Sequence, residues 1–141
     1  MAARVRRGVV LAADTIVVLD GEPLGKPASP DAAREMLRRL RGREHEVVTG
    51  LAVVDAGTGR ATSTAVTSLV RMAEYSDATI DAYVATGAPL DKAGGYAIQD
   101  LGAELVAGVV GSYTNVIGLP VGETRRLLTE FGVPVNPRSP A

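Results

Sequence analysis

One apolar stretch near the start of the sequence constrains the fold most. Residues 9–13 are continuously apolar, which is typical of a strand buried on both faces of a sheet. Asp14-Thr15 interrupts the run, residues 16–19 resume it, and Asp20-Gly21 predicts a tight turn. A carboxylate in a buried strand needs a partner, a metal or a cleft. We therefore expect a sheet that carries a polar site at Asp14.

The rest of the sequence alternates helix and strand signals. Two helices are predicted to begin at Ser-Pro or Ser-Asp pairs and to end at glycines, and two strand-like runs are predicted to form a hairpin. These segments are a helix from Ser29 to Gly42, strands over 46–55 and 62–70, a helix from Ser76 to Gly87 and a last helix over about 121–131. The pattern predicts a single α/β domain over residues 1–141, a mixed twisted sheet flanked by helices, with a frayed tail at residues 134–141.

Composition excludes several classes of protein. The 141 residues are 46% hydrophobic and carry a net charge of −1, which argues against disorder and against a general nucleic-acid footprint. Without cysteine there is no disulfide, thiol nucleophile or cysteine-based metal site. The apolar run at residues 9–13 is too short for a signal peptide core or a membrane span. We expect a soluble, cytoplasmic protein with no nucleic-acid or membrane partner.

The basic residues are unevenly chosen. Of the fifteen, all but Lys26 and Lys92 are arginine, and both lysines lie in glycine-flanked stretches that read as loops. A compact ammonium is suited to meeting a phosphate oxygen as a point charge. The alternative is that both lysines are ordinary surface residues that occur by chance in an arginine-rich chain.

Asp14 is the strongest single candidate for chemistry. Following an apolar strand, it is placed to hold a divalent cation or to orient a water molecule. An Asp that only caps a turn is an equally open interpretation.

A second candidate is the loop over residues 91–99, which contains Asp91, Lys92, Gly94, Gly95 and Gln99. The glycines would let backbone N–H groups approach an anion, and the lysine adds charge. The loop matches neither the P-loop nor the dinucleotide-binding fingerprint. Gln99 offers a donor and an acceptor that suit the edge of a base, although a surface amide is the alternative.

The single histidine, His45, is predicted to be a cross-strand or rim residue. No second histidine completes a zinc site, and no serine has the sequence context of a hydrolase nucleophile. The residues alone therefore favour phosphate chemistry assisted by a hard cation, and they do not name a substrate.

Several of these segments, in order, resemble the Maf family of nucleotide pyrophosphatases, whose fold is like that of inosine triphosphatase. The resemblance spans about residues 9–131. The segments that carry it are Ala13-Asp14-Thr15 with residues 17–21, Leu24-Gly25-Lys26-Pro27, residues 45–47 and 49–50, residues 87–94, Tyr96, Ile98-Gln99, residues 101–102 and residues 112–120.

The resemblance implies hydrolysis of a nucleoside triphosphate to the monophosphate and pyrophosphate with Mg²⁺ or Mn²⁺. It implies that Asp14 is the proton acceptor and a candidate metal ligand, and that Lys26 and Lys92 neutralise phosphate. Asp91 would position the metal or Lys92. Thr15 and Gln99 match positions associated with base selection and favour dTTP and UTP, with 7-methyl-GTP as the alternative.

The sequence departs from the family pattern at its start. Members usually begin with a strand and a Ser-x-Ser-Pro-Arg-Arg motif some fifty residues before the Ala-Asp-Thr segment, and neither is present here. We expect a mis-assigned start. The alternatives are a truncated paralogue that binds nucleotide without turnover, or a site completed across a homodimer.

Overall fold

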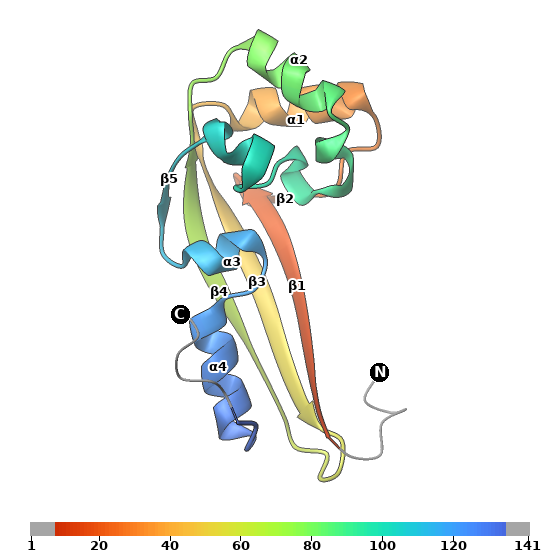
Figure 1. Cartoon of the computed structure of the whole chain (residues 1–141), viewed down its shortest axis with the longest axis vertical. Helices are drawn as coiled ribbons and strands as arrows, with labels where there is room; N and C mark the ends of the chain where they lie inside the picture. Colours follow the sequence, from red (N-terminus) through yellow and green to blue (C-terminus); the bar gives the residue numbers. More distant parts are fainter. Residues whose placement is uncertain (1–7, 135–141) are drawn as a thin grey trace.

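The computed structural model describes residues 8–134, which form one five-stranded sheet with helices around it (Figure 1). The strands are β1 (Val9–Leu19), β2 (Glu22–Leu24), β3 (Glu44–Asp55), β4 (Ala61–Met72) and β5 (Val106–Val110). Their order in the sheet is β2-β1-β3-β4-β5. The predicted α/β fold with flanking helices is confirmed. The expected mixed sheet is corrected, because every pairing in the described range is antiparallel.

The predicted turn at Asp20-Gly21 and the predicted hairpin of the two long strands are both confirmed. Asp20 and Gly21 join β1 to β2 with φ angles of 52° and 78°, the left-handed pair that a two-residue hairpin turn requires. The longer hairpin joins β3 to β4, with the register Val54↔Ala61 closest to its turn. The two strands of this hairpin form the middle of the sheet, where β1 pairs with β3 and β5 pairs with β4.

The predicted helices form where their capping residues indicate. Helix α1 (Pro30–Leu40) begins at Ser29, whose hydroxyl accepts a hydrogen bond from the Ala32 amide at 3.1 Å. Helix α2 (Asp77–Ala85) begins at Ser76 in the same way. Helix α4 (Val121–Glu130) matches the last predicted helix.

Other elements were not predicted. These are the strands β2 and β5, the short helix α3 (Tyr113–Ile117), and the 3-10 turns η2 (Ala88–Asp91), η3 (Ala93–Gly95) and η4 (Asp100–Leu105). The 3-10 turn η3 lies within the loop predicted over residues 91–99, and η2 and η4 lie on either side of it. The frayed tail predicted at 134–141 lies, apart from residue 134, outside the described residues.

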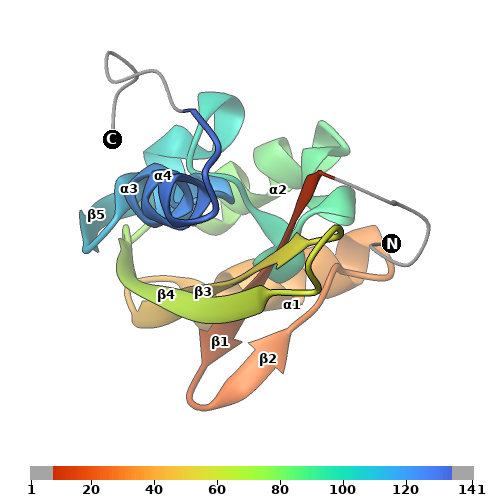
Figure 2. The same ribbon diagram turned by 90° about the horizontal axis from the view of Figure 1, so that it is seen from below.

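The core consists of two apolar clusters on the same face of the sheet. The larger packs α1, α2 and the loop after α2 against β1, β3 and β4, with Leu37 and Val70 fully buried. The smaller joins α4 to the far end of the long strands through Leu51, Val53 and Leu127. Helices α3 and α4 lie over one face of the sheet (Figure 2).

The other face is largely exposed along the middle of the long strands, and this corrects the expectation for residues 9–13. Ala12 and Asp14 on this face are exposed and Ile16 beside them is 42% exposed, while Ala13, which alternation places on the same face as Thr15, is exposed as well. An antiparallel sheet can face water on one side, which lets a carboxylate stand in the middle of β1 without a buried partner.

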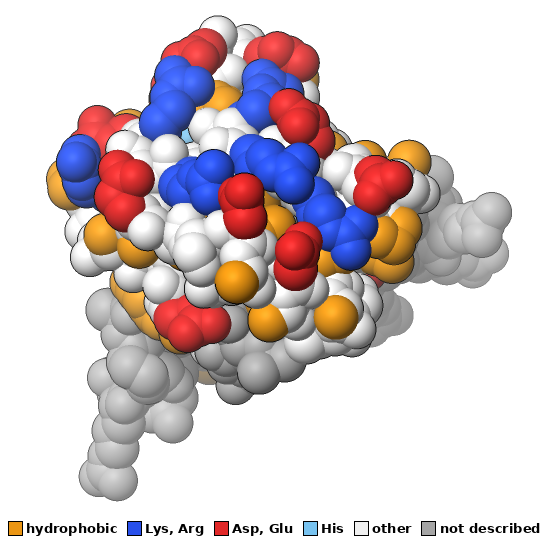
Figure 3. All heavy atoms as spheres, turned by 90° about the horizontal axis from the view of Figure 1, so that it is seen from above, with side chains coloured by type: hydrophobic (Ala, Val, Ile, Leu, Met, Phe, Trp, Pro, Cys, Tyr) orange, Lys and Arg blue, Asp and Glu red, His pale blue; other side chains and the backbone are white. Residues whose placement is uncertain are grey.

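The arginines of α1 and the Arg41 that follows it form a solvated, paired surface. Arg34 bonds to Asp31 and Asp81, and Arg41 bonds to Asp77 at 2.7 Å. Figure 3 shows Lys and Arg side chains interleaved with Asp and Glu over the α1–α2 end. In the described part of the chain, no helix has the length and apolar character needed to cross a membrane.

Candidate functional site

A pocket of about 410 Å³ lies where the sheet, the glycine-rich loop and α3 meet. Its walls come from β1, β3, the segment after β2, η3, residues 96–99 and α3 with its C-terminal glycine. The lining residues are Thr15, Val17, Lys26, Val47, Lys92, Ala93, Tyr96, Ala97, Ile98, Gln99, Val116, Ile117 and Gly118. Segments from the whole length of the described chain therefore build one cavity.

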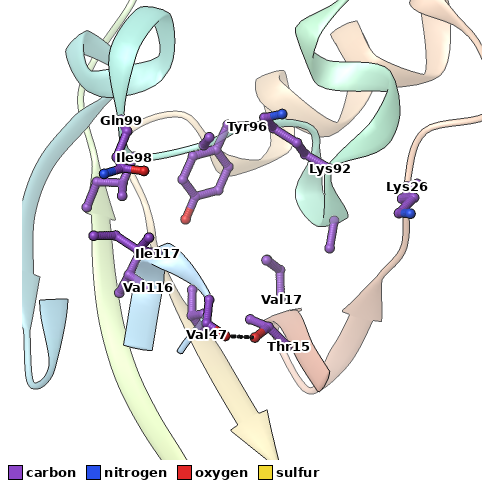
Figure 4. A pocket seen from close by; sticks show the side chains of 13 residues that line it. Thr15, Val17, Lys26, Val47, Lys92, Tyr96, Ile98, Gln99, Val116 and Ile117 are labelled. Atoms are coloured by element: carbon purple, nitrogen blue, oxygen red, sulfur yellow. Dashed lines mark hydrogen bonds between the residues drawn. The ribbon is translucent and has the colours of Figure 1, made fainter. Parts of the chain in front are cut away.

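The two sides of the pocket differ in chemistry. Figure 4 shows Lys26 and Lys92 on one side and Ile98, Gln99 and Ile117 on the opposite side. Two cations suit an anion, whereas apolar walls with one amide suit an aromatic ring that carries polar edge atoms. The pocket therefore has a cationic side and an apolar side.

The lysines are held differently. Lys92 is partly buried, and its ammonium bonds to the Asp91 carboxylate at 3.1 Å. The hydrogen bond and charge of Lys92 keep the pKa of Asp91 below its usual range. Lys26 is exposed and forms no ion pair with any described residue. One ammonium is thus tethered, and the other is available to a ligand.

Thr15 is fixed by two hydrogen bonds at the edge of the pocket. Its hydroxyl oxygen lies 2.8 Å from that of Thr49 on β3 and 3.1 Å from the carbonyl oxygen of Gly118, the residue that ends α3 (Figure 4). Thr49 lies opposite Thr15 in the β1–β3 register and is fully buried. A single threonine thus joins β1, β3 and α3.

Tyr96 forms another wall and is held by the only histidine. The Tyr96 hydroxyl lies 2.5 Å from Nε2 of His45, and the two rings meet edge to face. His45 is buried within β3 instead of lying at a rim, and burial lowers its pKa from 6.5 to about 4. It is therefore neutral at pH 7 and acts as a neutral partner for Tyr96.

The short helix α3 is anchored by Asn115, which is fully buried. Its amide nitrogen lies within 3.1 Å of the carbonyl oxygens of Val47 and Val66 and of the Ser68 hydroxyl. The anchor attaches α3 to two strands. Because Val116 and Ile117 follow it directly, it also sets the apolar wall of the pocket.

The glycines of the loop, which we expect near an anion, pack closely in this structure and use their N–H groups within the protein. Gly94 and Gly95 are buried with φ of 74° and 83°, and their amides already donate to the carbonyl oxygens of Gly25 and Lys92. A Cβ on Gly94 would lie 3.1 Å from Val17. Neither N–H is free to bind a phosphate.

Gln99 lines the pocket and is exposed, so its amide is accessible to a ligand. The backbone before it is held by Gly102, because a Cβ there would lie 1.8 Å from the Ala97 carbonyl oxygen. This close approach requires glycine and fixes residues 97–99 against η4.

Asp14 lies outside the pocket. Successive side chains of a strand alternate, so Asp14 belongs to the face opposite Thr15, where it is exposed among Gly50, Ala52 and Ser63. Within residues 8–134, no three His, Asp or Glu side chains come together. The described residues therefore do not fit a preformed divalent-metal site.

The structure brings Thr15, Lys26, Lys92 and Gln99 together, and it places Asp91 on Lys92. Sequence reasoning assigned no supporting role to His45, Thr49, Tyr96 and Asn115, although all four lie in segments that resemble the family. Thr49 and His45 are visible as polar positions in the apolar alternation of β3. Nothing in the sequence indicated their partners.

Comparison with known proteins identifies the family. A family model described as Maf-like protein matches residues 1–131. A dTTP/UTP pyrophosphatase of Moorella thermoacetica is 51% identical over 135 residues, covering 96% of this chain and 70% of that protein. Proteins of the same name from Anaeromyxobacter dehalogenans and Dictyoglomus thermophilum are 52% and 45% identical, each covering 90% of this chain and 66% of the relative. The chain spans about two thirds of the length of these relatives, and it belongs to the Maf family.

Proposed function

We propose that this protein is a nucleoside triphosphate pyrophosphatase that acts on dTTP and UTP. The observation that carries the proposal is the pocket, with two lysines on one side and an amide among apolar side chains on the other. The curated relatives named dTTP/UTP pyrophosphatase support the same substrates.

In the proposed reaction a water oxygen attacks the α-phosphorus, and the bond from that phosphorus to the bridging oxygen of the β-phosphate breaks. Pyrophosphate leaves, and the nucleoside monophosphate retains the new oxygen. Lys26 and Lys92 neutralise the charge on the triphosphate, and positioned charges of this kind supply most of the catalysis in phosphoryl transfer. Asp91 holds Lys92 through their 3.1 Å ion pair.

The base is proposed to occupy the apolar side of the pocket. Ile98, Val116 and Ile117 would contact the faces of the ring, while Gln99 and Thr15 would meet its polar edge. Uracil and thymine present one N–H between two carbonyl oxygens, which an amide and a hydroxyl can match.

We propose Asp14 as the proton acceptor on the strength of the family resemblance. The proposal rests on the resemblance alone, because the Asp14 side chain is exposed on the sheet face opposite the pocket-lining Thr15. We also propose dependence on Mg²⁺ or Mn²⁺ from the same resemblance. The described residues offer no preformed set of ligands for this ion.

The testing experiment is pyrophosphate release with dTTP, UTP, CTP and 7-methyl-GTP, in the presence of Mg²⁺ or Mn²⁺ and after chelation. We expect release from dTTP and UTP, and a fall of at least about 100-fold in Asp14→Asn, the typical contribution of a positioned proton acceptor. The matched control is Glu46→Gln, which neutralises an exposed carboxylate on the same sheet face and should stay within about twofold of the parent. Absence of release from every nucleotide would contradict the proposed function. An Asp14→Asn variant as active as the parent would remove Asp14 from the chemistry.

A further inference from the structure

The hydrogen bonds around Thr15 form a chain with one direction. A threonine hydroxyl has one proton to donate and two lone pairs that accept. Thr49 is fully buried, and its hydroxyl has no hydrogen-bond partner other than Thr15 among the described residues. The Gly118 carbonyl oxygen, 3.1 Å from Thr15, can only accept.

Only one arrangement satisfies all three groups. If Thr49 donates to Thr15 and Thr15 donates to Gly118, both hydroxyl protons are used. In the reverse arrangement Thr15 would donate to Thr49, and the buried Thr49 proton would face no acceptor in the described part of the chain. Leaving a buried donor unpaired is costly, so the first arrangement is favoured.

Thr15 lines the pocket, so the direction of this chain decides which hydrogen bond Thr15 can form with a ligand. Its proton is engaged by Gly118, one lone pair is engaged by Thr49, and one lone pair remains. Thr15 can therefore accept a hydrogen bond from a ligand, and it cannot donate one without breaking the chain.

We propose that Thr49, a residue outside the pocket lining, fixes Thr15 as a hydrogen-bond acceptor toward the ligand. The pocket therefore selects bases that carry a ring N–H. Uracil and thymine present N3–H, a donor. Cytosine presents an unprotonated N3, which would face the remaining lone pair of Thr15. The selection rests on the proposed function for the identity of the ligand, and Thr49 acts as a positioning residue through Thr15.

The test is equilibrium binding of UMP and CMP, which requires no turnover. In the parent we expect UMP to bind about tenfold more tightly than CMP, the value of one hydrogen bond between neutral groups. Thr49→Val keeps the side-chain shape and removes the donor, so the ratio should fall toward one. Thr49→Ser restores a hydroxyl and should restore the ratio. Thr67→Val makes the same change on the exposed face of β4 and should leave the ratio unchanged.

A binding measurement on the unmodified protein tests the inference even if the variants fail to fold. UMP methylated at N3 lacks the donor and should bind the parent about as weakly as CMP. Equal binding of UMP and its N3-methyl form, or a parental UMP/CMP ratio retained in a folded Thr49→Val variant, would overturn the inference. The two proposals fail separately. Selective binding that depends on Thr49 without pyrophosphate release overturns only the proposed function, whereas release with selectivity indifferent to Thr49 overturns only the inference.

Discussion

Three polar side chains lie buried behind the pocket, and each holds part of its wall. His45 bonds to Tyr96, Thr49 to Thr15, and Asn115 to the strand carbonyl of Val47. Burying such groups costs free energy unless they are hydrogen-bonded. Their polarity is visible in the sequence, but their partners are 51, 34 and 68 residues away, so residue patterns alone could not pair them. Of the pocket-lining residues, Lys26, Lys92 and Gln99 stood out from the sequence alone as loop lysines and a loop amide, whereas Thr15 was named only by the family resemblance.

The buried His45 predicts a dependence of stability on pH. Its pKa falls from 6.5 to about 4 on folding because burial disfavours the charged ring. Between these values the unfolded chain binds more protons than the folded one, so stability rises with pH across this window and is lost as pH falls from 6.5 to 4. The full loss is about 3 kcal/mol.

Urea unfolding at pH 4, 5.5 and 7 measures this dependence. His45→Gln removes the only titrating histidine, so subtracting its pH profile from that of the parent isolates the contribution of His45. Parallel profiles for the parent and the variant would contradict the assignment.

At the scale of elements, the sequence predicted those parts whose signals are local. Ser29 and Ser76 cap α1 and α2 as expected, and the β3–β4 hairpin follows its β-branched pattern. The elements missed are short and depend on distant partners. Strand β5 has five residues and pairs with β4, and α3 has five residues and is held by a side chain bonded across two strands. Strand β1 runs through Asp14 because the sheet face there is open, a tertiary property.

The anchoring of α3 predicts a combined effect on stability and binding. Asn115→Ala removes the amide that reaches Val47, Val66 and Ser68, and it leaves a small cavity. We expect a loss of about 2–4 kcal/mol in the free energy of unfolding, and weaker nucleotide binding because Val116 and Ile117 lose their position. Chemical denaturation and equilibrium binding measure the two effects. Ser68→Ala removes one partner of Asn115 and the Ser68–Ser112 hydrogen bond at the start of α3, and it should show the smaller loss because the bonds of Asn115 to Val47 and Val66 remain. An Asn115→Ala variant with unchanged binding would mean that α3 holds its place without the anchor.

At the scale of the molecule, the described chain has its two apolar clusters at different places along the long strands. Helices α1 and α2 gather at one end, near the pocket, and α4 packs toward the other (Figure 1). Neither cluster was predictable as a unit, because each joins side chains from segments separated along the sequence. A substitution that destabilises one cluster should therefore lower the local stability of the elements around that cluster most.

This arrangement predicts different outcomes for two matched substitutions. Leu127→Ala in the α4 cluster and Leu37→Ala in the larger cluster each remove a nearly fully buried leucine, with an expected local cost of about 2–5 kcal/mol. For Leu127→Ala we expect faster amide hydrogen exchange in α4 and nucleotide affinity within about twofold of the parent. For Leu37→Ala we expect faster exchange in α1 and weaker binding. Loss of binding in Leu127→Ala would show that the two clusters unfold together.

The walls of the pocket meet across very different distances along the chain. Thr15 reaches Thr49 over 34 residues and Gly118 over 103 residues, so the chain must close long loops before the cavity exists. Contacts of this kind form only after the entropy of loop closure has been overcome, which makes them characteristic of slowly folding topologies with high contact order. A ligand that requires these walls together binds only chains whose long-range contacts have closed, so nucleotide binding reports the completion of folding as well as the chemistry of the site.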